Sequence, residues 1–350
     1  MVMLVCSGVA LVLALASCAV GGISADDPPS EPLAERHVRG GMPNVLAKLA
    51  RGHAVRIVYL GGSITNADDG WRRQSLEWFR KQYPNANIEG INAAISGTGS
   101  DLAAFRLRQD VLKYEPDLLL VEFAVNDGWT SDGRIQRSME GVVRQTWRAL
   151  PNCDIVFVYT IHEGMLKELQ RGQLPHSVKS HEIVADHYGI PSILFGLEVA
   201  QLEKDGRLIF TGSQPRTEAE KAALKGKVLF SADGAHPYPQ GHALYVQALA
   251  RSVAKMRGVG ERGPHALPQP LFLDNYEHVT MTPVERAKLS AGWRELDPNE
   301  GPDRQGVVEE AAGGMAGREA GRIRHRPLPR HKPDGVRRGG TGLRPDHRDG

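Results

Sequence analysis

The sequence has few cysteines and no clear metal-binding motif, which excludes several classes of protein. Of its 350 residues only Cys6, Cys18 and Cys153 are cysteines, too few for a disulfide framework or a cysteine-rich zinc site. The histidines form no HExxH motif and no other paired metal spacing. No lysine follows the Gly61-Gly62 pair, although a phosphate loop of the Walker type requires one. The sequence therefore predicts neither a metal site nor a nucleotide-phosphate loop.

The main part of the chain also has no large excess of positive or negative charge. Lys and Arg number 43 against 41 Asp and Glu, a net charge of +2. Residues 301–350 hold 11 basic and 7 acidic residues, so residues 1–300 hold 32 and 34, a net charge of −2. A nucleic-acid-binding domain normally carries a marked basic excess. We therefore expect no nucleic-acid partner.

The N-terminal segment contains no charged residue before Asp26. Residues 2–20 are almost wholly apolar or small, as in a secretory signal peptide, which we place at residues 1–25. The segment Leu15-Ala16-Ser17-Cys18 resembles a bacterial lipobox, in which the cysteine becomes lipidated and N-terminal. Ordinary cleavage near Ala25 and a retained anchor helix are the alternatives. We expect an exported bacterial protein that is periplasmic, outer-membrane-anchored through Cys18, or extracellular.

The C-terminal 50 residues lack aromatic side chains altogether. Residues 301–350 contain 11 glycines and 5 prolines, so they cannot bury a core, and we predict a disordered basic tail. A shift of the reading frame near residue 300 would also produce such a composition. Residues 258–300 are expected to form an extension that packs on the body, because Leu271-Phe272-Leu273 and Trp293 are apolar.

The body, residues 51–257, alternates short apolar runs with amphipathic stretches after a lead-in at 26–50. Such alternation is typical of a parallel sheet covered by helices on both faces. The predicted class is α/β, a three-layer α/β/α sandwich with a five-stranded parallel sheet, and residues 203–230 are predicted to be a polar insertion over one edge. Strands are expected at residues 56–60, 87–92, 117–124, 154–160 and 191–195. Helices are expected at residues 71–82, 102–114, 135–150, 178–188 and 243–256.

Four segments with reactive or permissive residues follow these elements. Ser63 lies in GGSIT after the first strand, Gly97 in NAAISG after the second, and Asn126 in NDG after the third. Asp233 and His236 lie in DGAHP before the last helix. The carboxyl ends of parallel strands share one edge of the sheet, where ligands bind. Together the segments offer a nucleophile, a base, a carboxylate that orients the base, and oxyanion donors.

This constellation closely resembles the SGNH (GDSL-like) hydrolase family, whose four sequence blocks contribute Ser, Gly, Asn and His. The resemblance covers residues 55–256 and implies a flavodoxin-like fold. It implies that Ser63 is the nucleophile and that Asp233 and His236 complete the triad. It also implies an oxyanion hole formed by the Ser63 N–H, Gly97 and Asn126. One departure is clear, because the usual GDS is GGS here, which leaves the hydrogen bonding of that loop open.

Other residues near these segments have two possible roles. Trp71 and Arg72 could touch substrate, although core packing is favoured for Trp71. Asp127 follows the oxyanion asparagine, and a turn-capping role is favoured over a catalytic one. His162-Glu163 follows the fourth strand and either lines the pocket or forms a surface loop.

The resemblance implies hydrolysis of a carboxylic ester without a cofactor. The polar insertion and the lack of a long apolar lid favour short acyl groups, most of all acetyl groups on extracellular glycans. A lipase or lysophospholipase and a noncatalytic glycan-binding protein on the same fold remain as alternatives. We expect a monomer whose partners are small-molecule or glycan esters.

Overall fold

The computed structural model describes residues 33–282 and residue 286. The predicted signal peptide with Cys18, the linker up to residue 32, Trp293 and the tail at 301–350 therefore lie outside the described residues. The chain divides into two units, Met1–Val279 and Thr280–Gly350. The fold and the site below belong to the first unit.

The central sheet contains five parallel strands, as predicted, and one additional strand at its edge. The strand order is β1-β6-β5-β4-β2-β3, and β1 pairs antiparallel with β6. The sequence analysis missed β1 because a two-residue strand has no periodicity to detect. The strands of this sheet are β1 (Arg36–His37), β2 (Val55–Gly61), β3 (Ile88–Asn92), β4 (Leu118–Glu122), β5 (Asp154–Val158) and β6 (Ser192–Ile193).

Helices cover both faces of the sheet, which explains why its central strands are apolar throughout. Helices α3 and α10 pack together on one face, while α4, α5 and α7 pack side by side on the other. All five residues of β4 and of β5 are buried. The α-helices are α1 (Pro43–Ala50), α2 (Ser63–Asn66), α3 (Trp71–Gln82), α4 (Ser100–Asp110), α5 (Asp132–Ala149), α6 (Leu166–Gln170), α7 (His176–Tyr188), α8 (Gly196–Lys204), α9 (Glu218–Ala223) and α10 (Pro239–Met256). Single 3-10 turns are η1 (Leu112–Tyr114), η2 (Asn126–Trp129), η3 (Glu163–Met165) and η4 (Tyr276–His278).

The strand order creates a topological switch point between β2 and β4. From β2 the chain moves outward to β3 and then returns to the other side of β2 to form β4. Right-handed crossovers put the helices of these two connections on opposite faces, so the loops after β2 and β4 diverge. A crevice at the carboxyl ends of these strands is the usual ligand site of such folds.

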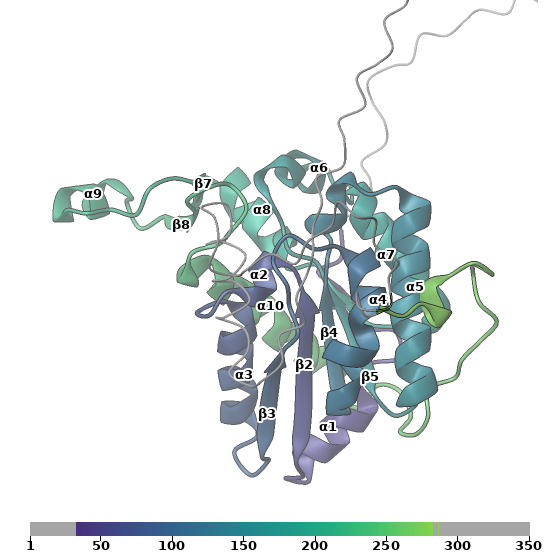
Figure 1. The fold of residues 1–350 in the computed structure, drawn as a ribbon. Helices are drawn as coiled ribbons and strands as arrows, with labels where there is room; N and C mark the ends of the chain where they lie inside the picture. Colours follow the sequence, from purple (N-terminus) through teal and green to yellow (C-terminus); the bar gives the residue numbers. More distant parts are fainter. Residues whose placement is uncertain (1–32, 283–285, 287–350) are drawn as a thin grey trace, which may run out of the picture. The chain divides into compact units, whose positions relative to one another are not determined.

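The segment predicted to be a polar insertion forms a small structure of its own. Strands β7 (Leu208–Thr211) and β8 (Val228–Ser231) make a separate two-stranded parallel sheet. The exposed helix α9 comes between these strands in the sequence and extends away from the main sheet (Figure 1). Thr217 and Glu220 form a capping box at its start, which satisfies N–H groups that no tertiary contact reaches. Strand β8 leads directly into the loop that carries Asp233 and His236.

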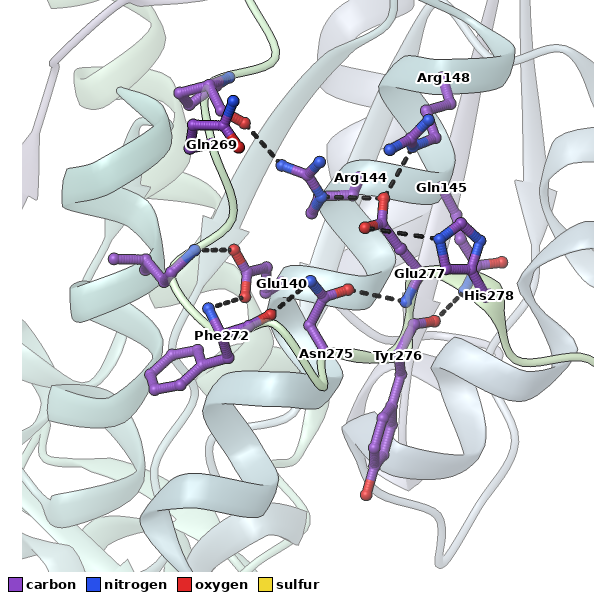
Figure 2. Close-up of polar contacts among 12 residues, drawn as sticks. Glu140, Arg144, Gln145, Arg148, Gln269, Phe272, Asn275, Tyr276, Glu277 and His278 are labelled. Carbon is purple, nitrogen blue, oxygen red and sulfur yellow. Dashed lines mark hydrogen bonds and ion pairs between the residues drawn. The ribbon is translucent and has the colours of Figure 1, made fainter.

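The segment 264–279 crosses over α5 and makes several polar contacts with it (Figure 2). The Glu140 carboxylate is fully buried and accepts hydrogen bonds from the backbone N–H groups of Leu271 (2.6 Å) and Phe272 (2.9 Å). Arg144 donates to the Glu277 carboxylate at 2.9 Å. The expected apolar packing of residues 271–273 is wrong for Leu273, which is 94% exposed, and for Leu271, which is also exposed. Polar anchoring has no apolar sequence pattern, so it could not be foreseen.

Glu140→Ala should destabilise the protein by about 3 kcal/mol, because it removes the acceptor of two partly buried backbone N–H groups and of the buried Tyr188 hydroxyl. Urea denaturation followed by circular dichroism would measure the change. Glu77→Ala is the matched control, because Glu77 is exposed and pairs only with Arg73 on the same helix. That surface pair is worth under about 1 kcal/mol. Equal destabilisation by the two substitutions would contradict this account of the segment.

Candidate active site

Ser63 follows β2 directly and begins the short helix α2. The two preceding glycines are explained by their surroundings in the structure. Gly62 has an ordinary φ of −94°. A Cβ on Gly62 would lie 2.2 Å from Oδ1 of Asn126, and one on Gly61 would lie 2.5 Å from Oγ1 of Thr65. A side chain at either position would displace these neighbours, which gives a physical reason for GGS in place of GDS.

Asp233, His236 and Ser63 form a continuous chain of hydrogen bonds. Nδ1 of His236 lies 2.7 Å from Oδ2 of Asp233, and Nε2 lies 2.8 Å from Oγ of Ser63. With the proton on Nδ1, the imidazole donates to the carboxylate and accepts from the serine hydroxyl. The structure thus brings together three residues that are up to 173 positions apart in the sequence.

The Asp233 carboxylate is held in place by its own loop. Oδ1 accepts hydrogen bonds from the backbone N–H groups of Ala235 (2.9 Å) and His236 (2.8 Å) and from the Ser231 hydroxyl (3.0 Å). Partial desolvation raises the pKa of Asp233, but the hydrogen bonds from His236, Ala235 and Ser231 outweigh it and hold the pKa well below its usual range. Asp233 is therefore ionised near neutral pH and can orient the His236 ring.

Gly97 and Asn126 lie at the same pocket as Ser63. Gly97 has a φ of +71°, a left-handed conformation that favours glycine. Within residues 33–282, neither the Gly97 N–H nor the Asn126 side chain has a hydrogen-bond partner. Both groups are therefore free to bind a ligand. The pocket has a volume of about 530 Å³ and is lined by Ser63, Ile64, Gly97, Val125, Asn126, Trp129, His162, Glu163, Asp233, Gly234, Ala235 and His236.

Asp127 ties together the loops that carry Gly97 and Asn126. Its side chain is buried, and Oδ1 accepts a hydrogen bond from the Ser100 N–H at 3.0 Å. Oδ2 lies 2.9 Å from Nε2 of the buried His181. The favoured turn-capping role is not what the structure shows, because the carboxylate binds the N–H of Ser100, the first residue of α4, and the ring of His181. Trp71 is fully buried, which confirms the favoured core role.

The sequence analysis missed Glu122, the last residue of β4. Its carboxylate is completely buried and accepts hydrogen bonds from the hydroxyls of Thr65 (2.8 Å) and Thr160 (2.7 Å). It also accepts the backbone N–H of Gly62, and burial raises its pKa. The carboxylate of Glu122 thus reaches from the neighbouring strand β4 to the turn before Ser63 and accepts a hydrogen bond there. A single acidic residue inside the run LLLVEFAV was the available signal.

His162 and Glu163 line the pocket, and so does Trp129, which was not among the predicted candidates. Trp129 is 84% exposed, and its ring stacks on His162 with centroids 5.7 Å apart and planes 16° apart. A larger hollow of about 1190 Å³ lies elsewhere, lined by residues such as Lys48, Arg56 and Asp117. It contains none of the predicted site residues. Among the described residues no group of His, Cys, Asp and Glu side chains could hold a metal ion, and no helix there is long and apolar enough to cross a membrane.

His242, in the first turn of α10, should make the protein acid-sensitive. Its side chain is buried, and Nδ1 lacks a hydrogen-bond partner among the described residues. Burial lowers the pKa of His242 to about 4, with nearby Asp69 opposing and His236 adding to the shift. At pH values between about 4 and the unfolded pKa of about 6.5, His242 binds more protons in the unfolded chain than in the folded protein. Stability is therefore lost as pH falls through this window, by about 3 kcal/mol from this one group.

This dependence can be measured by urea denaturation at several pH values between 4.5 and 7. In His242→Leu the free energy of unfolding should fall less steeply with decreasing pH than in the wild type. The difference in slope isolates His242 from the carboxylates that also titrate in acid. Parallel slopes in the two proteins would show that His242 does not carry the effect.

The fold is a flavodoxin-like α/β/α sandwich, and it carries a serine–histidine–aspartate arrangement near the switch point. The chain belongs to the GDSL-like Lipase/Acylhydrolase family, whose model matches residues 59–244. The matched range contains all five predicted site residues. No curated protein matches the chain in sequence.

Solved structures with a similar fold include esterases with glycan substrates. A two-domain esterase active on acetylated mannans, co-crystallised with mannopentaose, is 25% identical with a TM-score of 0.53, and the match covers 69% of this chain and 60% of that one. The same esterase without the mannopentaose is 24% identical with a TM-score of 0.53, covering 67% and 59%. An acetylxylan esterase from Geobacillus stearothermophilus is 16% identical with a TM-score of 0.45, covering 57% and 94%. The chain thus spans about 60% of the length of the two-domain esterase.

Proposed function

We propose that the protein is a serine esterase that removes short acyl groups, above all acetyl, from extracellular glycans. The observation that carries this proposal is the hydrogen-bonded chain from Asp233 through His236 to Ser63, with distances of 2.7 and 2.8 Å. It lies at the carboxyl ends of the parallel strands, beside two unpartnered donors. A nucleophile, a base in contact with it and an orienting carboxylate are the parts that acyl transfer requires.

In the first half of the reaction Ser63 Oγ attacks the ester carbonyl carbon while Nε2 of His236 takes the hydroxyl proton. Asp233 keeps the proton of the imidazole on Nδ1 and stabilises the imidazolium that forms. The negative oxygen of the tetrahedral intermediate is bound by the N–H groups of Ser63 and Gly97 and by the Asn126 amide. Collapse of the intermediate breaks the bond to the alcohol, which leaves with the proton from His236.

In the second half water replaces the alcohol. His236 takes a proton from the water as it attacks the acyl group on Ser63, and the same oxyanion donors stabilise the second tetrahedral intermediate. Its collapse returns the proton to Ser63 and releases the carboxylic acid. No cofactor takes part in these steps.

The shape and chemistry of the pocket favour a small acyl group. Its apolar lining consists of Ile64, Val125, Ala235 and the exposed Trp129, while the remaining residues are polar or glycine. A long acyl chain needs a continuous apolar surface to replace its hydration. The similarity to an esterase active on acetylated mannans supports the same conclusion. We further propose export through the N-terminal segment, lipidation at Cys18 and a monomeric state.

A panel of esters tests the proposal. Hydrolysis should be fastest for C2 among linear C2–C16 p-nitrophenyl esters, and acetate should be released from acetylated mannan or xylan. A maximum at C8 or longer would favour a lipase or lysophospholipase. Binding of glycans without turnover of any ester would favour a noncatalytic glycan-binding protein.

A further inference from the structure

We propose that Trp129, His162 and Glu163 form a subsite for one neutral pyranose ring of the substrate, beside the catalytic serine. The proposal rests on the proposed esterase function and adds to it the residues that recognise the alcohol part of the ester. All three side chains line the same pocket as Ser63 and His236. None of them takes part in the chemical steps above.

The Trp129 ring is exposed but held in position. The residue ends the 3-10 turn η2, which starts at Asn126, and Asp127 in the same turn is buried against His181. One face of the indole stacks on His162 at 5.7 Å between centroids. A ring that is 84% exposed and yet braced in this way loses little conformational entropy when a ligand covers it. The C–H face of a pyranose is flat and apolar, and it fits such a surface.

His162 offers a hydrogen-bond donor at the edge of this stacked pair. Its Nδ1 accepts the backbone N–H of Gly164 at 3.1 Å, so the neutral ring carries its proton on Nε2. Burial lowers the pKa of His162, which keeps the ring neutral near pH 7. Within the part of the chain that the structure describes, Nε2 has no partner. It is therefore available to a sugar hydroxyl.

Glu163 supplies the complementary acceptor. Its backbone N–H donates to the Gly234 carbonyl at 2.8 Å, which fixes the residue against the loop of Asp233 and His236. Its carboxylate makes no hydrogen bond or ion pair with the described residues, and a Cβ on Gly234 would lie 2.9 Å from its Oε2. A free carboxylate readily accepts hydrogen bonds from hydroxyl groups.

The charge of the pocket selects against anionic ligands. Among the residues that the structure describes, no lysine or arginine lines it and none pairs with Glu163, which adds a negative charge. A phosphate headgroup or a uronic acid would therefore be repelled, and like charges brought together at a binding surface are unfavourable. An apolar face, one donor and one acceptor match a neutral sugar ring.

The kinetic test compares two acetyl esters that differ only in the alcohol. One is an acetylated mannooligosaccharide and the other is ethyl acetate, which has no ring to stack. In Trp129→Ala the ratio of kcat/KM for the oligosaccharide to that for ethyl acetate should fall about tenfold, mainly through KM, and Trp129→Phe should restore part of it. Tyr114→Ala removes a distant exposed aromatic ring and should leave the ratio unchanged. An unchanged ratio in Trp129→Ala would overturn the proposal.

A binding test does not depend on catalysis. Ser63→Ala should bind deacetylated mannooligosaccharide, measured by calorimetry, and Ser63→Ala/Trp129→Ala should bind it about tenfold more weakly. Acetylated polygalacturonate fragments should compete poorly with the mannooligosaccharide for binding to Ser63→Ala. They should compete better for binding to Ser63→Ala/Glu163→Gln. If no ester is hydrolysed but this binding pattern holds, the esterase proposal fails and the subsite stands. If esters are hydrolysed but the two variants bind the sugar equally, the subsite is overturned.

Discussion

Replacing Ser63 with alanine should lower the rate of ester hydrolysis by at least about 10⁴-fold without unfolding the protein. The substitution removes only Oγ, which His236 contacts at 2.8 Å, and with it the formation of an acyl-enzyme. Initial rates with p-nitrophenyl acetate, together with the melting temperature, measure the two effects separately. His236→Ala should cause a loss of similar size, because the two residues act as a unit and the losses are not additive.

Ser131→Ala is the matched control for this experiment. Ser131 is exposed before α5 and its hydroxyl caps nothing, so both rate and stability should match the wild type. Activity of Ser63→Ala near the wild-type level would exclude Ser63 as the nucleophile. A large drop in melting temperature would instead mean that the serine is needed for folding.

Gly62→Asp, which restores the GDS of the family pattern, should impair the enzyme rather than improve it. The new Cβ would lie 2.2 Å from Oδ1 of Asn126 and force that side chain away from the pocket. Loss of one oxyanion donor typically lowers kcat by about 10²–10³-fold. We expect a loss of this size in kcat with acetyl esters, and Gly62→Ala should show it as well, since the clash arises at Cβ.

Gly128→Ala provides the control for these glycine substitutions. Gly128 lies in the same 3-10 turn as Asn126, but a Cβ there meets no atom within 4 Å. Its activity should stay within a few-fold of the wild type. If Gly62→Asp is as active as Gly128→Ala, the explanation of the GGS sequence by close approach of Asn126 is wrong.

The main elements of the fold could be predicted because burial produces strong sequence patterns. Continuous apolar runs indicated β4 and β5, whose residues are all buried. The helix expected at 71–82 is found at Trp71–Gln82, since its amphipathic period is clear. The edge strand β1, at Arg36–His37, could not be predicted because it has only two residues. Its pairing with β6 depends on tertiary contact.

The site could be predicted only in part. Reactive residues that follow apolar strands point to one edge of the sheet, and Ser63, Asp233 and His236 do meet there. Glu122 and Trp129 were missed for opposite reasons. Glu122 is a buried carboxylate whose hydroxyl partners come from distant segments, and Trp129 is an exposed ring that sequence patterns do not distinguish from core tryptophans.

Covalent labelling tests the central claim, acyl transfer through Ser63, most directly. The protein would be treated with a fluorophosphonate, digested, and the modified residue located by mass spectrometry. The account predicts one adduct, on Ser63. The adduct should form much more slowly in His236→Ala, and in the wild type labelling should reach completion at the point where ester hydrolysis is fully inhibited. An adduct on another serine, or full hydrolytic activity in a protein labelled completely at Ser63, would contradict it.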